Sequence, residues 1–264
     1  MTNPSEKLLV TLKDGIKRIT INRPERRNSV DHETVQLLRD AVQHSVDDGT
    51  RVVILTGAGD SFCAGADLAA TSASDIANFD VTKALRENVN PTILAMRNLP
   101  VPIVARVHGH AVGVGCNYAL ACDMIVASEQ ALFGQVFIRI GLMPDGGSTF
   151  FLPRLVGFHK AFELMAIGDI IGAQEAQQLG IVNKVVPFSE LDATVDTLAA
   201  RLAQAPGMAI AKIKAGLNHG SQSDLAAALE FEAVNQDACF HSPDFIEGVT
   251  AFVQKRKAVF GKGA

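Results

Sequence analysis

Two segments of the sequence combine small residues with a backbone suited to holding negative charge on a carbonyl oxygen. Residues 62–68 (FCAGADL) follow a predicted strand, and their alanine and glycine residues let the backbone approach a ligand closely and direct amides at it. Residues 109–116 (GHAVGVGC) form a glycine-rich turn between a predicted strand and a predicted helix. Because amides at a helix N-terminus favour an anion or an oxyanion, both segments are candidates for an oxyanion site.

A third segment, residues 140–149 (IGLMPDGGST), places a single carboxylate, Asp145, between a proline and a glycine pair. We expect Phe137, Leu142 and Met143 to desolvate this carboxylate, which would raise its pKa and make it a better proton acceptor. The alternative is that Asp145 caps the helix that follows. A single base in an apolar pocket is what a proton transfer requires.

The glycine-rich turn also invites comparison with the dinucleotide-binding fingerprint G-x-G-x-x-G. Aligning Gly113 and Gly115 with its first two glycines puts Tyr118 where the third glycine should pack, and no well-placed ribose-binding acid follows. Dinucleotide binding is therefore not expected. For residues 62–68, a tight turn with Asp67 as a helix cap is the structural alternative.

Other polar residues near the predicted strand ends are expected to be structural. His108 and His110 flank the glycine turn, where histidines are usually hydrogen-bonded parts of the framework. Asp123 is expected to bind backbone groups. The four cysteines lack C-x-x-C spacing and lie in apolar surroundings, so they indicate reduced, buried thiols and no metal site.

The composition favours a globular protein, since the chain has 264 residues and 48% of them are hydrophobic. The formal net charge of -4, and the absence of a basic stripe beyond residues 23–27, argue against nucleic-acid binding. No apolar stretch reaches the roughly 18 residues that a membrane helix needs, and the N-terminus has no apolar signal region. We therefore expect a cytoplasmic protein that binds neither nucleic acid nor membrane.

Hydrophobic periodicity predicts strands that alternate with helices in the earlier part of the chain. A turn at residues 13–15 joins two apolar runs into a β-hairpin, and Asp31 begins an amphipathic helix. Alternating strands and helices indicate right-handed crossovers and a largely parallel sheet. The predicted strands are residues 8–12, 16–21, 52–55, 103–107 and 124–127.

Helical patterns dominate the later part of the chain, and a single strand-like run, residues 181–186, interrupts them. The last predicted helix is opened by Ser242, which suits a cap, and by Pro243, which suits a first helical turn. The other helices predicted there are residues 161–167, 173–179, 191–202, 208–217 and 223–239.

The three segments, in this order and at these separations, resemble the enoyl-CoA hydratase/isomerase (crotonase) superfamily along nearly the whole chain. Further matching stretches are Asn22-Arg23-Pro24 with Asn28, residues 173–186 (AQEAQQLGIVNKVV), and residues 247–252 (EGVTAF) with Lys255-Arg256. The resemblance implies an α/β fold with a superhelical β-β-α core, residues 1–200, and a C-terminal α-helical trimerisation region, residues 201–264. It also implies a homotrimer or a dimer of trimers.

For the site, the resemblance implies an acyl-CoA thioester substrate, with coenzyme A as its carrier and no tightly bound cofactor. The amides of Ala66 and Val114 would form the oxyanion hole for the thioester oxygen, with valine at position 114 where relatives often carry glycine. Removing a proton beside a thioester carbonyl places negative charge on oxygen, which such donors stabilise.

The resemblance also assigns the residues that hold coenzyme A. The adenine and its neighbouring groups would lie against Ala64, Ala66, Asp67 and Leu68, with Arg23 or Arg26 near the phosphates. Phe252 and Lys255 would reach the carrier from a C-terminal helix. The alternatives are that Phe252 belongs to the core with Phe245 and Val249, and that Lys255 is simply solvated.

Two positions depart from the hydrating members of the superfamily, which use a pair of glutamates to position and split water. Those positions fall on Asn117 and Phe137, neither of which can act as a base. These two residues are expected to line an apolar substrate pocket. Asp145 instead matches the single acidic residue of isomerase-type relatives, including the ring-oxepin isomerase of phenylacetate breakdown.

The leading hypothesis is therefore an enoyl-CoA isomerase in which Asp145 takes a proton from Cα and returns it to Cγ. A first alternative is an enoyl-CoA hydratase, or an acyl-CoA hydrolase, in which Asp145 activates water with help from Asn117. A second alternative, from a different class, is a catalytically silent acyl-CoA-binding protein that kept the fold.

Overall fold

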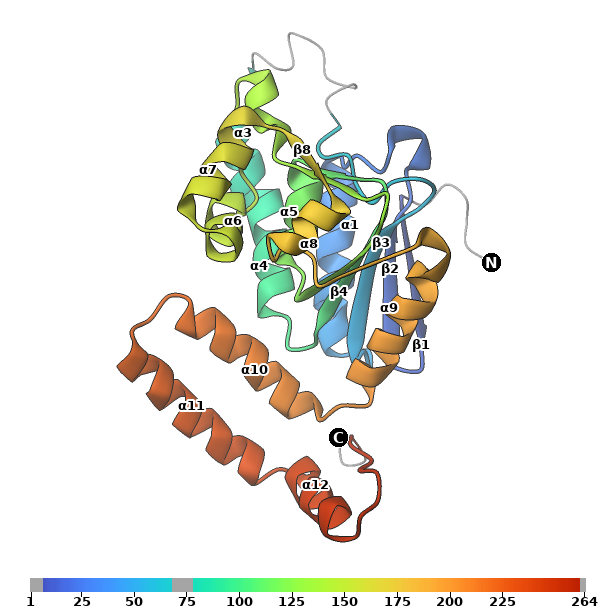
Figure 1. The fold of residues 1–264 in the computed structure, drawn as a ribbon, viewed down its shortest axis with the longest axis vertical. Coiled ribbons are helices and arrows are strands. Elements are labelled where there is room, and N and C mark those ends of the chain that lie inside the picture. The colour runs from blue at the N-terminus through green and yellow to red at the C-terminus, as the bar shows by residue number, and fades with distance from the viewer. Residues whose placement is uncertain (1–6, 68–77, 262–264) are drawn as a thin grey trace.

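The computed structural model describes residues 7–67 and 78–261 and shows an α/β body with three further helices at the C-terminal end (Figure 1). Within these residues the body is built on one six-stranded and one three-stranded sheet. The larger sheet runs in the order β1 (Leu8–Lys13), β2 (Ile16–Ile21), β3 (Val52–Gly57), β4 (Ile103–Val107), β6 (Met124–Ser128) and β9 (Lys184–Val186).

The larger sheet begins with the predicted β-hairpin. Strands β1 and β2 pair antiparallel, and Asp14 and Gly15 between them both have positive φ, at 52° and 75°, as a two-residue hairpin turn requires. Every later pairing in this sheet is parallel. The predicted antiparallel start followed by a parallel sheet is thus confirmed.

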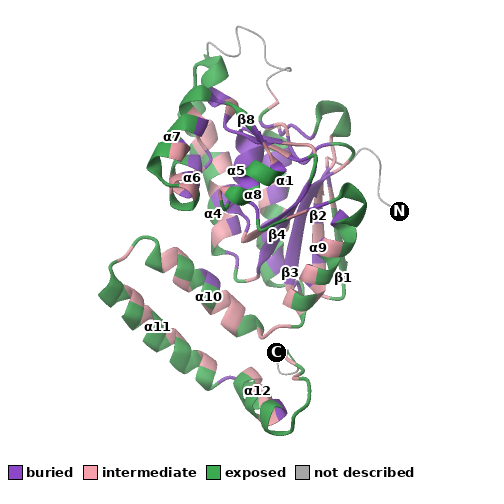
Figure 2. Cartoon of the chain, viewed as in Figure 1, coloured by how far each residue is buried: buried purple, intermediate pink, exposed green. Residues whose placement is uncertain are grey.

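Alternation along β3 shows how the sheet is covered on both faces. Val53 and Leu55 lie in the core cluster that includes residues of α1 (His32–Gln43) and α4 (Asn90–Asn98), whereas Val52 and Ile54 pack with residues of α9 (Phe188–Ala203). Successive side chains of a strand point to opposite faces, so one strand supplies both cores. The buried strands lie between these helices in Figure 2.

The chain then repeats a strand, strand, helix path that connects the two sheets. After β4 it forms β5 (His110–Val112) and α5 (Val114–Ala121), and after β6 it forms β7 (Leu132–Gly134). Strand β5 pairs parallel with β7, and β7 pairs antiparallel with β8 (Ile170–Gly172). Cys63, beyond β3, forms a parallel bridge with Ala111 in the same way. The predicted superhelical β-β-α core is confirmed.

Shorter elements complete the body. The predicted strand-like run 181–186 is only half correct: the amides of Ile181 and Val182 both donate to the carbonyl of Ala176, so these residues close the turn after a helix and the strand begins at Lys184. The remaining elements are η1 (Pro24–Arg26), η2 (His44–Val46), α3 (Val81–Ala84), η3 (Leu85–Val89), η4 (Val136–Ile140), α6 (Ser148–Val156), α7 (Phe158–Ile167) and α8 (Ala173–Gln178).

The last three helices, α10 (Gly207–Gly220), α11 (Leu225–Phe240) and α12 (Pro243–Val253), extend away from the body, at the bottom of Figure 1. Ser242 caps α12 as predicted, since its hydroxyl accepts from the amide of Phe245. Lys214 on α10 is buried against the body, where its Nζ lies 2.8 Å from the carboxylate of Asp123 and 2.9 Å from the carbonyl of Met96. Among the residues placed by the structure, no helix combines the length and apolar character needed to cross a membrane.

Candidate active site

The first candidate donor, the amide of Ala66, lies in a short stretch of extended chain. Val30 bonds to both neighbours of Ala66: its amide donates to the Gly65 carbonyl at 2.8 Å, and its carbonyl accepts from the Asp67 amide at 2.9 Å. In a parallel bridge the central residue directs its own N–H away from the partner. The Ala66 amide donates to no described backbone acceptor, and the residue is exposed.

The second candidate donor is the amide of Val114, the first residue of α5. An amide in the first turn of a helix has no acceptor within the helix and lies at the positive end of the helix dipole. Gly113 before it has φ 57° and ψ -133°, a conformation open essentially to glycine alone, and its own amide donates to the Gly134 carbonyl. The turn therefore leaves the Val114 amide without a backbone acceptor among the described residues.

Close backbone contacts place these two donors side by side. A Cβ placed on Gly65 would lie 3.0 Å from the carbonyl oxygen of Val112 and 3.8 Å from Cα of Gly113. A Cβ on Gly115 would lie 2.3 Å from the carbonyl oxygen of Cys63, so only glycine fits there. The structure therefore brings together the two glycine-containing segments that the sequence singled out.

Asp145 lies in the loop between η4 and α6, and its backbone and side chain behave differently. Its carbonyl oxygen accepts from Asn117 Nδ2 at 2.8 Å and from Ser148 Oγ at 3.0 Å. Its carboxylate forms no hydrogen bond or ion pair with a residue that the structure describes. The alternative that Asp145 caps α6 is wrong, because the cap position is Gly147 and no side chain caps the helix.

The Asp145 loop packs against the start of α5. A Cβ on the next residue, Gly146, would lie 3.4 Å from Val114 Cγ2, and a Cβ on Gly113 would lie 3.9 Å from Cζ of Phe137. The base candidate, the buried Phe137 ring and the two amides thus share one region. Burial raises the pKa of the Asp145 carboxyl above its ordinary value, and no charged partner offsets that effect.

The predicted cause of this burial was only partly correct. Phe137 is buried, whereas Leu142 and Met143 are 49% and 72% exposed and do not shield the carboxylate. The short helix η4 ends at Gly141, whose left-handed φ of 75° turns the chain outward before these two residues. The protection of Asp145 therefore comes from the packed start of α5 and its surroundings.

Asn117 does not line a substrate pocket, contrary to prediction. Its side chain is fully buried, and both of its polar ends are occupied: Nδ2 donates to the Asp145 carbonyl, and Oδ1 accepts from Gln135 Nε2 at 2.8 Å. Because the side chain is fully buried, it is poorly placed to assist a water molecule. Gln135 was not identified from the sequence, and the only signal for it is its place directly after the strand that ends at Gly134.

Arg23 and Asp67 lie near the site and form an ion pair of 2.7 Å, in which the side chains are only 12% and 4% exposed. Their contact with coenzyme A stays a prediction. Arg26 is exposed and has no ion pair with a described residue, which leaves it available to a phosphate. Ala64 is half-exposed beside this pair, and Leu68 lies outside the described residues.

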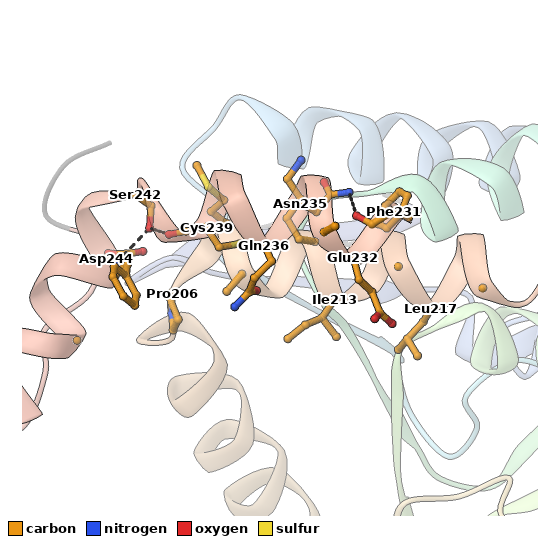
Figure 3. Close-up of a pocket in the computed structure, with 18 of the residues that line it drawn as sticks. Pro206, Ile213, Leu217, Phe231, Glu232, Asn235, Gln236, Cys239, Ser242 and Asp244 are labelled. Carbon is orange, nitrogen blue, oxygen red and sulfur yellow. Dashed lines mark hydrogen bonds between the residues drawn. The ribbon is translucent and has the colours of Figure 1, made fainter. Parts of the chain in front are cut away.

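Phe252 and Lys255 do not lie at the site of their own chain. They belong to α12 and the turn after it, at the opposite end of the molecule from α5 (Figure 1). Phe252 is 84% exposed, so its predicted alternative role in the core is wrong as well. It lines a groove of about 1380 Å³ between α10, α11 and α12, where Ile213, Leu217 and Phe231 gather (Figure 3).

Other polar residues have the structural roles predicted for them. His108 accepts from Arg106 at Nδ1 and donates from Nε2 to the Gly59 carbonyl, while burial and the neighbouring guanidinium lower its pKa. Asp123 accepts from the Ile103 amide at 2.8 Å.

The cysteines carry no disulfide, and three of the four are buried. Burial raises the pKa of the Cys63 and Cys116 thiols to about 12, so both remain protonated at neutral pH. Over residues 7–67 and 78–261, no group of three or more metal-ligating side chains lies close enough to hold a metal ion.

Known proteins resemble this chain along almost its whole length. The family described as "Enoyl-CoA hydratase/isomerase" matches residues 11–263. The chain is 38% identical to crotonyl-CoA hydratase of Syntrophomonas wolfei and 35% identical to 1,2-epoxyphenylacetyl-CoA isomerase of Escherichia coli K12, in each case over 97% of this chain and 98% of the relative. Enoyl-CoA hydratase from Bacillus anthracis has a crystal structure that superposes with a TM-score of 0.89 at 32% identity, covering 97% of this chain and 99% of that one.

Fold, site geometry and relatives agree at the level of the family. The matched relatives include both hydrating and isomerising enzymes, and what they share is action on acyl-CoA thioesters. The chain therefore belongs to the enoyl-CoA hydratase/isomerase family and is an acyl-CoA-processing enzyme.

Proposed function

We propose that this protein isomerises the double bond of an enoyl-CoA thioester, with Asp145 moving the proton. One observation supports this above all: within residues 7–67 and 78–261, the half-buried Asp145 carboxylate has no polar partner, and it shares one region with two backbone amides that have no backbone acceptor there. Burial raises the pKa of this carboxyl, which makes its ionised form a stronger base than an exposed aspartate.

The reaction needs one base and one oxyanion site. The thioester oxygen binds between the amides of Ala66 and Val114, and Asp145 removes a proton from Cα of a 3-enoyl-CoA. The electron pair of that bond delocalises into a dienolate, whose charge rests on the oxygen. Each preorganised donor is worth roughly 3 kcal/mol in the transition state. Protonated Asp145 then returns the proton to Cγ, and the product is the conjugated 2-enoyl-CoA.

Hydration is the second candidate, because crotonyl-CoA hydratase of Syntrophomonas wolfei is among the similar relatives. In that reaction Asp145 would activate a water molecule for attack on Cβ. The structure offers it little help: Asn117 has both polar ends occupied, and Phe137 has no polar atom. We therefore rank isomerisation first, and oxygen from labelled water in the product would favour hydration.

Coenzyme A is proposed as the carrier of the substrate, with Arg26, which is exposed, or Arg23 near its phosphates. We further propose a homotrimer or a dimer of trimers, in which α12 of one chain places Phe252 and Lys255 beside the site of another. Exposed apolar side chains along α10, α11 and α12 support such an interface. Sedimentation of the purified protein tests it, since a monomer would leave both residues without a role.

The function is tested by following the conjugated thioester chromophore. The purified protein is mixed separately with a 3-enoyl-CoA and with a 2-enoyl-CoA, and the Asp145→Asn variant is assayed alongside. We expect the chromophore to form from the 3-enoyl substrate and the variant to lose this activity. Loss of the chromophore from the 2-enoyl substrate would show hydration instead, and binding of both without turnover would show an acyl-CoA-binding protein.

A further inference from the structure

We propose that Asn117 and Gln135 are positioning residues, which hold the backbone of Asp145 so that its carboxylate meets the substrate at a fixed place. The inference rests on the proposed function and adds to it a specific support for the base. Neither residue touches the reacting atoms in this arrangement, because both side chains are buried beneath the Asp145 loop.

The hydrogen bonds have one possible direction. The Asp145 carbonyl can only accept, so the Asn117 side chain must face it with Nδ2, at 2.8 Å. Asn117 Oδ1 is then turned toward Gln135, which must present its own donor, Nε2, at 2.8 Å. Gln135 thereby selects the orientation of the Asn117 amide, and that orientation is the one that can hold Asp145.

Because these side chains are buried, the hydrogen bonds between them are difficult to replace. Asn117 is fully buried and Gln135 is 2% exposed, so water is poorly placed to replace a lost partner. Gln135 Nε2 donates to Asn117 Oδ1, and the Gln135 side chain also interacts with the buried Cys116 thiol, so it is held in place among the described residues. A Cβ on Gly146 would lie 3.4 Å from Cβ of Asn117, so the loop rests directly on this side chain.

The contacts hold the main chain and leave the carboxylate unused. The Asp145 carbonyl accepts from Asn117 Nδ2, from Ser148 Oγ and from the Ser148 amide, whereas the carboxylate has no described partner. A carboxylate that accepts hydrogen bonds has a lower pKa and is a weaker base. Fixing the backbone is therefore the way to position this side chain without lowering its basicity.

Two variants test the role. Asn117→Ala removes the donor to the Asp145 carbonyl, and Gln135→Met keeps the volume but removes the group that orients Asn117. We expect kcat for 3-enoyl-CoA isomerisation to fall by about 10- to 100-fold in Asn117→Ala, and by less in Gln135→Met, because small displacements of a catalytic group are costly. KM should change by less than about threefold, since the oxyanion amides remain in place.

The pH profile separates positioning from a general loss of stability. A released loop exposes Asp145 to water, so its pKa should fall toward the ordinary value and the acid limb of kcat/KM should move to lower pH. Thr56→Val serves as the control, because it removes a buried hydrogen bond, to the Arg106 carbonyl, within the main sheet. It should lower Tm without moving the acid limb. Variants at Asn117 and Gln135 that behave like this control would overturn the proposal.

The outcome can be distinguished from failure of the proposed function. If the wild-type protein does not isomerise, the titration of the Asp145 carboxyl is followed by ¹³C NMR in the wild type and in both variants. A lower Asp145 pKa in Asn117→Ala and Gln135→Met supports the positioning role for whatever reaction the base serves. An unchanged pKa in both overturns it.

Discussion

The guanidinium of Arg23 and the carboxylate of Asp67 lie 2.7 Å apart, immediately beside the residue that offers the first oxyanion amide. The same guanidinium donates to the Ser29 carbonyl, one residue before the Val30 that brackets Ala66. An ion pair that joins these two stretches of chain stabilises the extended geometry around Ala66. The pair therefore joins the two stretches of chain on either side of the Ala66 bridge.

Asp67→Asn should destabilise the protein and reduce turnover. Removing one partner of a buried ion pair typically costs about 3 to 5 kcal/mol; we expect about 2 kcal/mol here, because Arg23 retains the Ser29 carbonyl and lies 3.5 Å from Asp31. Urea unfolding measures the change. The control is Asp196→Asn, which breaks the more exposed pair with Arg18 and should cost less than about 1 kcal/mol. Equal losses in the two variants would contradict a structural role for the Arg23 pair.

Gly115→Ala should separate the two oxyanion donors. Its Cβ would lie 2.3 Å from the Cys63 carbonyl oxygen, a backbone atom that can move only with the whole segment carrying Ala66. We expect a loss of about 1 to 3 kcal/mol in stability, as for other overpacked sites, and a fall in kcat. Gly172→Ala is the matched control, since that position has negative φ and nothing within 4 Å of an added Cβ. Wild-type turnover in Gly115→Ala would contradict the assignment of the two amides.

Part of the secondary structure was predictable because hydrophobic periodicity acts locally, whereas the three-residue strands β5, β7 and β8 were not identified from the sequence. The hairpin turn at Asp14 and Gly15, the Asp31 cap and the Ser242 cap all depend on residues within a few positions of one another. The oxyanion segments were recognisable for a related reason: strand, glycine turn and helix are adjacent in the chain, and the glycines are required by close backbone contacts.

The contacts that support the base were not predictable in this way. Asn117 and Gln135 are 18 positions apart and meet only because α5 and the chain after β7 fold against each other. The exposure of Met143 and Phe252 was not predictable either, since exposed apolar side chains look the same in a sequence as those that face a core. A charged residue that forms an ion pair, such as Arg23 with Asp67, also looks the same in a sequence as one that binds a ligand.

Asp145→Asn should stabilise the protein at neutral pH while abolishing its activity. The folded-state pKa of Asp145 is raised by burial, so the stability of the wild type is greatest when the carboxyl is protonated and falls as pH rises through the folded pKa. The asparagine variant carries no such charge. Calorimetry should show a higher Tm for the variant at about pH 7 and a smaller difference at about pH 4, near the ordinary pKa. A wild type more stable than the variant at neutral pH would indicate a hidden partner for the carboxylate.

His108 should make stability fall in mildly acidic solution. Burial and the Arg106 guanidinium lower the pKa of His108 below 6.5. The contribution of neutral His108 to the free energy of unfolding is therefore complete above that pH and is lost as pH falls toward the folded-state pKa. Protonation would also turn the acceptor facing Arg106 into a donor. Urea unfolding at about pH 7 and pH 5.5 measures the difference, which should shrink in His108→Gln. An equal pH dependence in the variant would assign the effect to another group.

Asn117→Glu should not turn the protein into a hydratase, although the family resemblance implies a glutamate at this position in hydrating members. A carboxylate cannot donate to the Asp145 carbonyl, and it would be buried beside that oxygen without compensation. We expect loss of isomerisation and no consumption of 2-enoyl-CoA, both read from the conjugated thioester chromophore. Asn117→Gln has the same length and keeps a donor, so it should retain more isomerase activity. Efficient hydration by Asn117→Glu would mean that the Asp145 loop keeps its place without the hydrogen bond from Asn117. It would also mean that the residue at position 117 alone decides between the two reactions.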